Sequence, residues 1–162
     1  MNKVGFFPYT PATQMLHGLV EGVAMLHEEG LDNVFARHDR HAEATRRAIK
    51  AWGLEILCRE PKHYSPTITA VLLPEGHDAD AFRGLALSTF DISYGMSFGK
   101  FLGKFFRIGH LGDTNDLTII GALAATEMSL ALANIPHKKG GVQAAMDCMV
   151  SAHGGAARKA AE

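Results

Sequence analysis

The chain has 162 residues, of which 47% are hydrophobic and 20% charged, and its formal net charge is −1. This size suffices for one domain with a substantial core, and the balanced charge excludes a general electrostatic attraction to nucleic acid. No apolar run approaches the roughly 20 residues of a membrane-spanning helix, and the first residues lack a signal-peptide core. We therefore expect a cytoplasmic protein without membrane or nucleic-acid partners, in which Cys58 and Cys148 stay reduced.

The first third of the chain predicts a short lead-in followed by two helices. Pro8 and Pro11 favour an extended, turn-rich opening. Apolar residues then recur at helical spacing over 16–26, and Gly30 ends the pattern. A second helix is expected over about 32–52. Its predicted buried side consists of Val34, Ala42, Ile49 and Trp52.

The middle of the chain changes to the spacing of strands. Residues 54–57 and 67–73 are expected to form strands, the second being rich in β-branched residues. Asp78 could cap a helix that ends near Leu87. Two more short strands are expected at 92–94 and 105–108. The glycine-bearing stretch between them, 95–100, lacks the spacing and the hydroxyl residue of a phosphate-binding loop, so a turn is predicted.

The last third predicts two further helices. One should run from Asn115 or Asp116 to about Asn134, and another should begin near Val142 and fray at 154–155. The expected apolar side of the longer helix consists of Leu117, Ile120, Ala124, Met128 and Ala131. The order of these elements is not a strict alternation of strand and helix. It predicts an α+β fold with a small, mostly antiparallel sheet covered by helices.

Arg107 is the first candidate for a ligand contact. It lies in a short apolar strand that Gly103 and Gly109 border. Because alternate side chains of a strand share a face, Arg107 should lie beside Phe105, opposite the core face. Its planar guanidinium suits a carboxylate or a phosphate through two parallel hydrogen bonds. The alternative is a structural arginine that pairs with a carboxylate on a neighbouring helix.

Two other stretches carry polar groups of interest. Between rigid prolines, Tyr9 and Thr10 precede a helix N-terminus, where fixed hydroxyls suit an anion such as a phosphate. The alternative there is a helix start capped by Thr10 or Thr13. His38 and His41 are three residues apart on one helix, but no further ligand lies near them in the sequence, so no metal site is expected.

Four ordered segments together resemble one family of enzymes. The segments are Phe6–Pro11, Glu28–His38, Ala51–Leu54 and Gly103–Gly112. They are similar to the C-terminal part of the serine–glyoxylate aminotransferases, which belong with the alanine–glyoxylate enzymes to the class V group of fold-type-I pyridoxal-phosphate enzymes. The similarity extends over about residues 5–145.

This resemblance implies a role for each candidate residue. Arg107 matches the arginine that binds the α-carboxylate of the amino-acid substrate. Thr10 matches a threonine that reaches the pyridoxal 5'-phosphate of the neighbouring subunit in a homodimer. The tyrosine that assists it in alanine–glyoxylate relatives lies where this chain has Phe7, and Tyr9 takes its place here. The implied reactants are an amino acid and a 2-oxo acid.

The resemblance also implies what this chain does not supply. In the family, a lysine that precedes the 6–11 region binds the cofactor covalently, and Lys3 has no suitable context for that role. The large domain is missing as well, so the chain alone is expected to be inactive. Residues 1–30 would then pack on the large domain, 31–145 would form the small domain, and 146–162 a helical or frayed tail. The competing hypothesis is a non-catalytic α+β module that binds a small carboxylate or a protein partner.

Overall fold

The computed structural model describes residues 5, 7 and 9–160, with side chains up to 154. Lys3, Phe6 and Pro8, which the sequence analysis singled out, lie outside the described residues. The chain forms two compact units, residues 1–36 and 37–162. None of the helices in the described part is both long and apolar enough to cross a membrane.

The first unit contains helix α1 and the beginning of α2. Helix α1 spans Thr13–Glu29 and has no buried residue. Gly30, at a φ of 83°, separates it from α2, which spans Leu31–Trp52 and continues into the second unit. A positive φ is costly for residues with a side chain, so glycine suits this junction.

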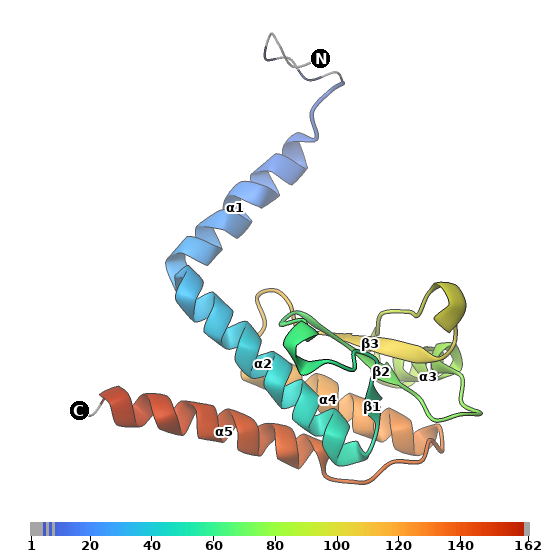
Figure 1. The fold of residues 1–162 in the computed structure, drawn as a ribbon. Helices are drawn as coiled ribbons and strands as arrows, with labels where there is room; N and C mark the ends of the chain where they lie inside the picture. Colours follow the sequence, from blue (N-terminus) through green and yellow to red (C-terminus); the bar gives the residue numbers. More distant parts are fainter. Residues whose placement is uncertain (1–4, 6, 8, 161–162) are drawn as a thin grey trace. The chain divides into compact units, whose positions relative to one another are not determined.

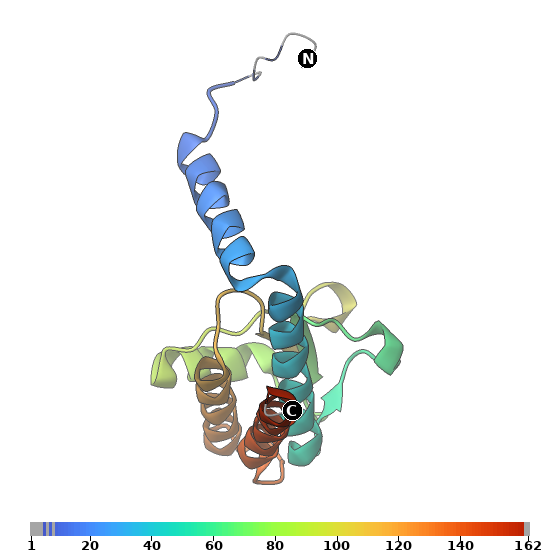
Figure 2. The same cartoon turned by 90° about the vertical axis from the view of Figure 1, so that its left-hand side faces the viewer.

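The second unit is an α+β fold, as the sequence predicts. Its elements are the remainder of α2, β1 (Glu55–Ile56), the 3₁₀ turn η1 (Pro61–His63), β2 (Ile68–Leu72), α3 (Ala79–Phe90), the 3₁₀ turn η2 (Gly99–Phe101), β3 (Phe105–Gly109), α4 (Asp116–Leu132) and α5 (Gly141–Ala160). The three strands form one antiparallel sheet in the order β1-β2-β3 (Figure 1). Helices α4 and α5 lie side by side (Figures 1 and 2).

One face of the sheet carries the hydrophobic core. Val71 of β2 and Phe106 and Ile108 of β3 are buried there among residues from all four helices of the unit. The helices contribute Ile49 and Trp52 from α2, Phe82 from α3, Leu123 and Leu130 from α4, and Met149 from α5. Helices therefore cover this face, and the alternate residues of β3 point away from it.

Three details differ from the sequence expectations. Residues 92–94 do not form a strand, because Asp91 ends α3 in a left-handed conformation and the chain meets β3 only at an isolated bridge between Gly95 and Arg107. Helix α3 continues to Phe90, three residues further than expected. Helix α5 continues through Gly154 to Ala160, because a glycine weakens a helix by only about 1 kcal/mol and does not remove its hydrogen bonds.

The buried side of α4 is also not the expected one. Leu117 and Met128 are exposed, whereas the buried residues are Ile119, Leu123, Ala125, Thr126, Ser129 and Leu130. This helix is apolar on almost every side, so periodicity alone does not identify the side that faces the core.

Candidate functional site

Arg107 lies between two very small neighbours in the sheet. On one side it is paired with Ala70 of β2. On the other side it forms the isolated bridge with Gly95, in which Gly95 N–H donates to Arg107 O at 3.0 Å and Arg107 N–H donates to Gly95 O at 2.9 Å. Cross-strand neighbours share a face of the sheet, so both small residues flank the arginine side chain.

The guanidinium of Arg107 has no polar partner among the described residues. The side chain is half-buried, and its Nε atom is buried without a hydrogen bond. The only described contact of the charged group is with the ring of Phe98, whose centroid lies 5.6 Å from Cζ. Phe98 itself lies edge-on to Phe105, with 6.0 Å between ring centroids. The alternative of a carboxylate from a neighbouring helix is therefore not observed in the described part of the chain.

An unpaired, half-buried guanidinium is an unfavourable arrangement unless a ligand completes it. A buried donor without an acceptor costs about 1–3 kcal/mol. The ring of Phe98 covers part of the charged group, and partial exclusion of water strengthens a charge-assisted hydrogen bond to an anion. The geometry suits a small carboxylate.

Tyr9 and Thr10 lie in the first unit, directly before α1. Both side chains are exposed, and with Phe7, Pro11 and Met15 they line a shallow hollow. Helix α1 has Ala12 at its N-cap position, and none of the described side chains forms a capping hydrogen bond there. The alternative of Thr10 or Thr13 as the cap is thus wrong, and the hydroxyl groups remain available to an anion near the helix N-terminus. Arg107 belongs to the other unit.

The histidines of α2 have structural partners. His41 is fully buried and its Nε2–H donates to Asp116 Oδ1 at 2.8 Å, while His38 Nε2 accepts from Gly112 N–H at 3.2 Å. Asp116 also accepts hydrogen bonds from Arg40 and His153. Burial raises the pKa of Asp116, but these hydrogen bonds outweigh burial and hold it well below its usual range. The described residues contain no group of three metal-ligating side chains.

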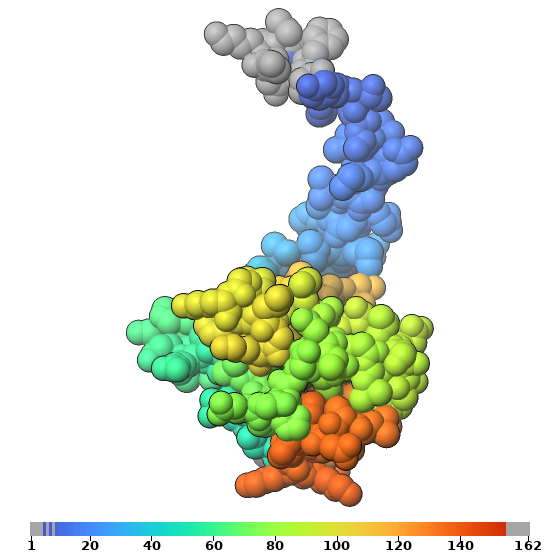
Figure 3. Space-filling model, turned by 90° about the vertical axis from the view of Figure 1, so that its right-hand side faces the viewer, coloured from blue at the N-terminus to red at the C-terminus, as the bar shows by residue number. Residues whose placement is uncertain are grey.

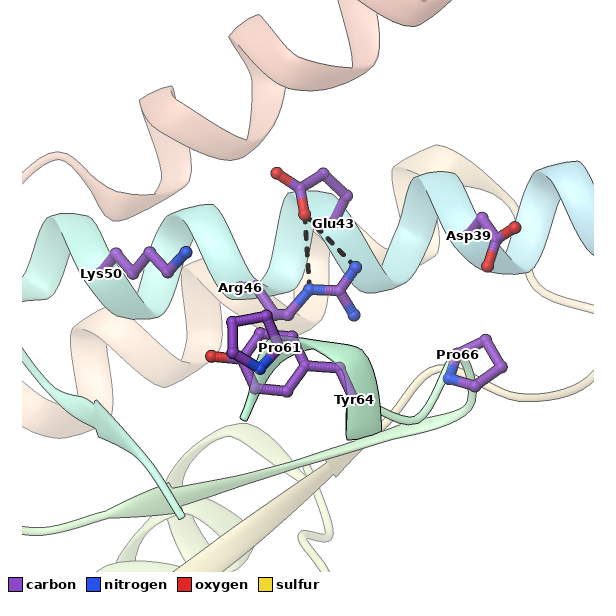
Figure 4. Close-up of a pocket in the computed structure, with 7 residues that line it drawn as sticks. All are labelled: Asp39, Glu43, Arg46, Lys50, Pro61, Tyr64 and Pro66. Atoms are coloured by element: carbon purple, nitrogen blue, oxygen red, sulfur yellow. Dashed lines mark hydrogen bonds and ion pairs between the residues drawn. The ribbon is translucent and has the colours of Figure 1, made fainter. Parts of the chain in front are cut away.

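A second hollow lies on the outer side of α2, between this helix and the η1 turn (Figure 4). Its arginine already has partners, since Arg46 donates to Glu43 at 3.3 Å and lies over the ring of Tyr64 at 5.3 Å. Unlike Arg107, none of its side chains has a buried nitrogen or oxygen without a partner. This hollow is therefore the weaker candidate.

Gly95 and Phe98, the two residues that border the guanidinium, are not identified by the sequence. The sequence predicts only a turn around Gly95, because its partner Arg107 lies 12 residues further along the chain. An isolated glycine beside a strand that contains an arginine is the only local signal for such a close approach, and it is weak.

The chain is similar to known aminotransferases over most of its length. It is 52% identical over 129 residues to the serine–glyoxylate aminotransferase of Hyphomicrobium methylovorum, a match that covers 80% of this chain and 32% of the relative. It is 40% identical over 156 residues to the L-aspartate–glyoxylate aminotransferase of Paracoccus denitrificans, covering 96% of this chain and 39% of that one. No family model matches the chain.

A solved aminotransferase structure is also similar to this chain. The pyridoxamine–pyruvate aminotransferase of Mesorhizobium loti superposes with a TM-score of 0.84 at 33% identity, covering 91% of this chain and 38% of that chain. The chain belongs to the aminotransferase family that includes the serine–glyoxylate enzymes. It spans about a third of the length of the relatives it matches.

Proposed function

We propose that this chain provides the substrate-carboxylate site of a serine–glyoxylate-type aminotransferase. The observation that carries the proposal is the half-buried Arg107, whose Nε has no partner among the described residues. In the whole enzyme, an amino group would pass from serine to glyoxylate and give hydroxypyruvate and glycine. Arg107 would bind the carboxylate of each reactant with two parallel hydrogen bonds and so fix the position of the reacting carbon.

Pyridoxal 5'-phosphate would supply the electron-accepting chemistry when bound. The exposed hydroxyls of Thr10 and Tyr9, next to a helix start without a side-chain cap, suit the phosphate of this cofactor in a neighbouring subunit of a homodimer. We place the lead-in at residues 1–30, the small domain at 31–145 and the tail at 146–162, in a cytoplasmic protein.

The role of Arg107 can be tested in a chimera that joins this chain to the part of the Hyphomicrobium methylovorum enzyme that it does not match. We expect Arg107→Ala to raise KM for serine and glyoxylate by about 100-fold, since a charged hydrogen-bonding partner contributes roughly 1.5–3 kcal/mol. Arg107→Lys should be impaired less, because it keeps the charge but loses the planar fork. An unchanged KM in Arg107→Ala would refute the assignment.

A second function is favoured by the exposed apolar side of α1. Exposed apolar surface on a helix marks a site of interaction with another protein. The chain could therefore be a non-catalytic module that binds a small carboxylate or a protein. Calorimetry of the 162-residue chain with serine, glyoxylate and pyridoxal phosphate separates the two functions. Tight, saturable binding of a carboxylate by the chain alone would favour the module.

A further inference from the structure

The side chain of Arg107 occupies space that is open only because residue 95 is a glycine. An ideal Cβ atom on Gly95 would lie 2.9 Å from Arg107 Nε, 3.0 Å from its Cβ and 3.3 Å from its Cζ. Such distances are shorter than ordinary van der Waals contacts, so any side chain at 95 would displace the guanidinium. Gly95 is not among the glycines with a positive φ, so the position requires glycine for space and not for its backbone conformation.

Phe98 contacts the guanidinium from the same loop. Its ring centroid lies 5.6 Å from Arg107 Cζ, a distance at which a cation is attracted to an aromatic face. Phe98 is 63% exposed, so it contributes little to the core. The loop that carries it, coloured yellow in Figure 3, lies on the surface of the second unit beside α3.

The loop is held by hydrogen bonds to β3 before Phe98 and by a hydrogen bond within the loop that spans Phe98. Before it, Gly95 forms two backbone hydrogen bonds with Arg107. The buried Ser97, directly before Phe98, accepts a hydrogen bond from Gly103 N–H at 2.8 Å, which closes the loop across Phe98 just before β3 begins. These hydrogen bonds hold Gly95 and the segment that carries Phe98 beside the arginine.

We propose that Gly95 and Phe98 are positioning residues that set the direction of the Arg107 guanidinium. Gly95 leaves room for the stem of the side chain, and Phe98 holds the face of the guanidinium. A bidentate hydrogen bond to a carboxylate requires the correct plane as well as the charge, so this orientation matters for binding. The proposal depends on the proposed function, in which Arg107 binds the substrate carboxylate.

The first test measures steady-state kinetics in the chimera described above. Gly95→Ala should raise KM for glyoxylate about 10- to 100-fold, as expected when a binding group is displaced by about 1 Å, and should change kcat less. Gly84→Ala on α3 is the matched control, since a Cβ there meets nothing within 4 Å, and its KM should be unchanged. Phe98→Ala should raise KM about two- to fivefold, whereas Phe98→Tyr, which keeps the ring, should not.

The second test uses the 162-residue chain itself and NMR of the Arg107 Nε–H group. In the unchanged chain, this proton should show contacts to the Phe98 ring and the Gly95 α-protons. Both contacts should disappear in Gly95→Ala and persist in Gly84→Ala. If Gly95→Ala does not fold, Phe98→Ala and Phe98→Tyr still test the positioning role. Phe98 is exposed, so both variants leave the core intact.

The outcomes separate this inference from the proposed function. If Arg107→Ala raises KM while Gly95→Ala and Phe98→Ala behave like the unchanged enzyme, the positioning role is wrong and the role of Arg107 stands. If Arg107→Ala has no effect on KM, the proposed function is wrong and the positioning role falls with it. A large effect of Arg107→Ala with graded effects of the other two variants supports both.

Discussion

Glu127 on α4 accepts a hydrogen bond from the indole Nε1–H of Trp52 at the end of α2, with 2.8 Å between the two atoms. The same carboxylate accepts the backbone N–H groups of Gly140 at 2.9 Å and Val142 at 3.1 Å. One side chain thus joins α2, α4 and the start of α5. Burial raises the pKa of Glu127, but these hydrogen bonds outweigh burial and lower it.

The close packing around Trp52 predicts that Gly141 cannot be replaced without loss of stability. A Cβ atom at position 141 would overlap the indole of Trp52, which is only 1% exposed. We expect Gly141→Ala to lower the free energy of unfolding by about 2 kcal/mol, the usual effect of overpacking. Denaturant unfolding followed by the fluorescence of the single tryptophan measures it. The control Gly121→Ala, whose Cβ meets nothing within 4 Å, should be neutral or up to about 1 kcal/mol more stable. Equal stability of the two variants would contradict the packing argument.

His110 predicts a loss of stability in mild acid. It is fully buried, its Nδ1–H donates to Pro66 O, and its Nε2 accepts from the Thr69 hydroxyl, each at 3.0 Å. Burial lowers the pKa of His110 from 6.5 to about 4. The unfolded chain therefore binds a proton that the folded chain rejects, so stability should fall as the pH decreases from about 6.5 to about 4 and then level off. The contribution is roughly 3 kcal/mol over this range.

Denaturant unfolding at several pH values tests this prediction in His110→Gln. The difference in unfolding free energy between this variant and the unchanged chain should shrink as the pH decreases, which separates His110 from His41, whose pKa burial also lowers. The exposed His63 provides the control variant His63→Gln, whose pH profile should follow that of the unchanged chain. A constant difference between His110→Gln and the unchanged chain would rule out the effect.

The proposed phosphate contact predicts that Thr10→Ala weakens cofactor binding in the chimera. Loss of a hydrogen bond to a charged phosphate should raise the dissociation constant of pyridoxal phosphate about tenfold, and Tyr9→Phe should have an effect of similar or smaller size. Absorbance titration with the cofactor measures both. Thr13→Ala is the control, because its hydroxyl lies 3.4 Å from the neighbouring Gln14 side chain. If Thr10→Ala and Thr13→Ala bind pyridoxal phosphate with the same dissociation constant, Thr10 does not contact the phosphate.

Helix α1 predicts self-association of the isolated chain. Leu19 is 62% and Val20 69% exposed, and no residue of α1 is buried in the described structure. Exposed apolar surface of this kind favours association. Light scattering should detect dimers or larger species that decrease when both residues are changed to Gln. His17→Gln on the same helix should leave the distribution unchanged. A purely monomeric unchanged chain at high concentration would contradict the prediction.

For α2 and β3, the sequence largely predicts which residues are buried. The expected buried side of α2, including Ala42, Ile49 and Trp52, is buried in the structure. The alternation of β3 likewise placed Phe106 and Ile108 in the core and Arg107 on the other face with Phe105. Both follow from local geometry, since an amphipathic helix or strand presents its apolar residues to one side.

The candidate site could be predicted only in part. A charged residue within an apolar strand indicates a ligand because charge is costly to hold there, so the sequence alone identifies Arg107. The contacts that border it were not, because Gly95 and Phe98 lie in a loop whose path depends on how residues 91–104 return to β3. The sequence of that loop carries no period that could indicate its direction.

By itself, the sequence determined the α+β class, the position of Arg107 on its strand and the family to which the chain belongs, because each of these depends on local pattern or on similarity. The tertiary structure decided which side of the uniformly apolar α4 is buried, that Glu127 joins three helices, and that a glycine makes room for Arg107. These features arise between residues far apart in the chain. Their energies depend on distances of a few ångströms that only the folded packing determines.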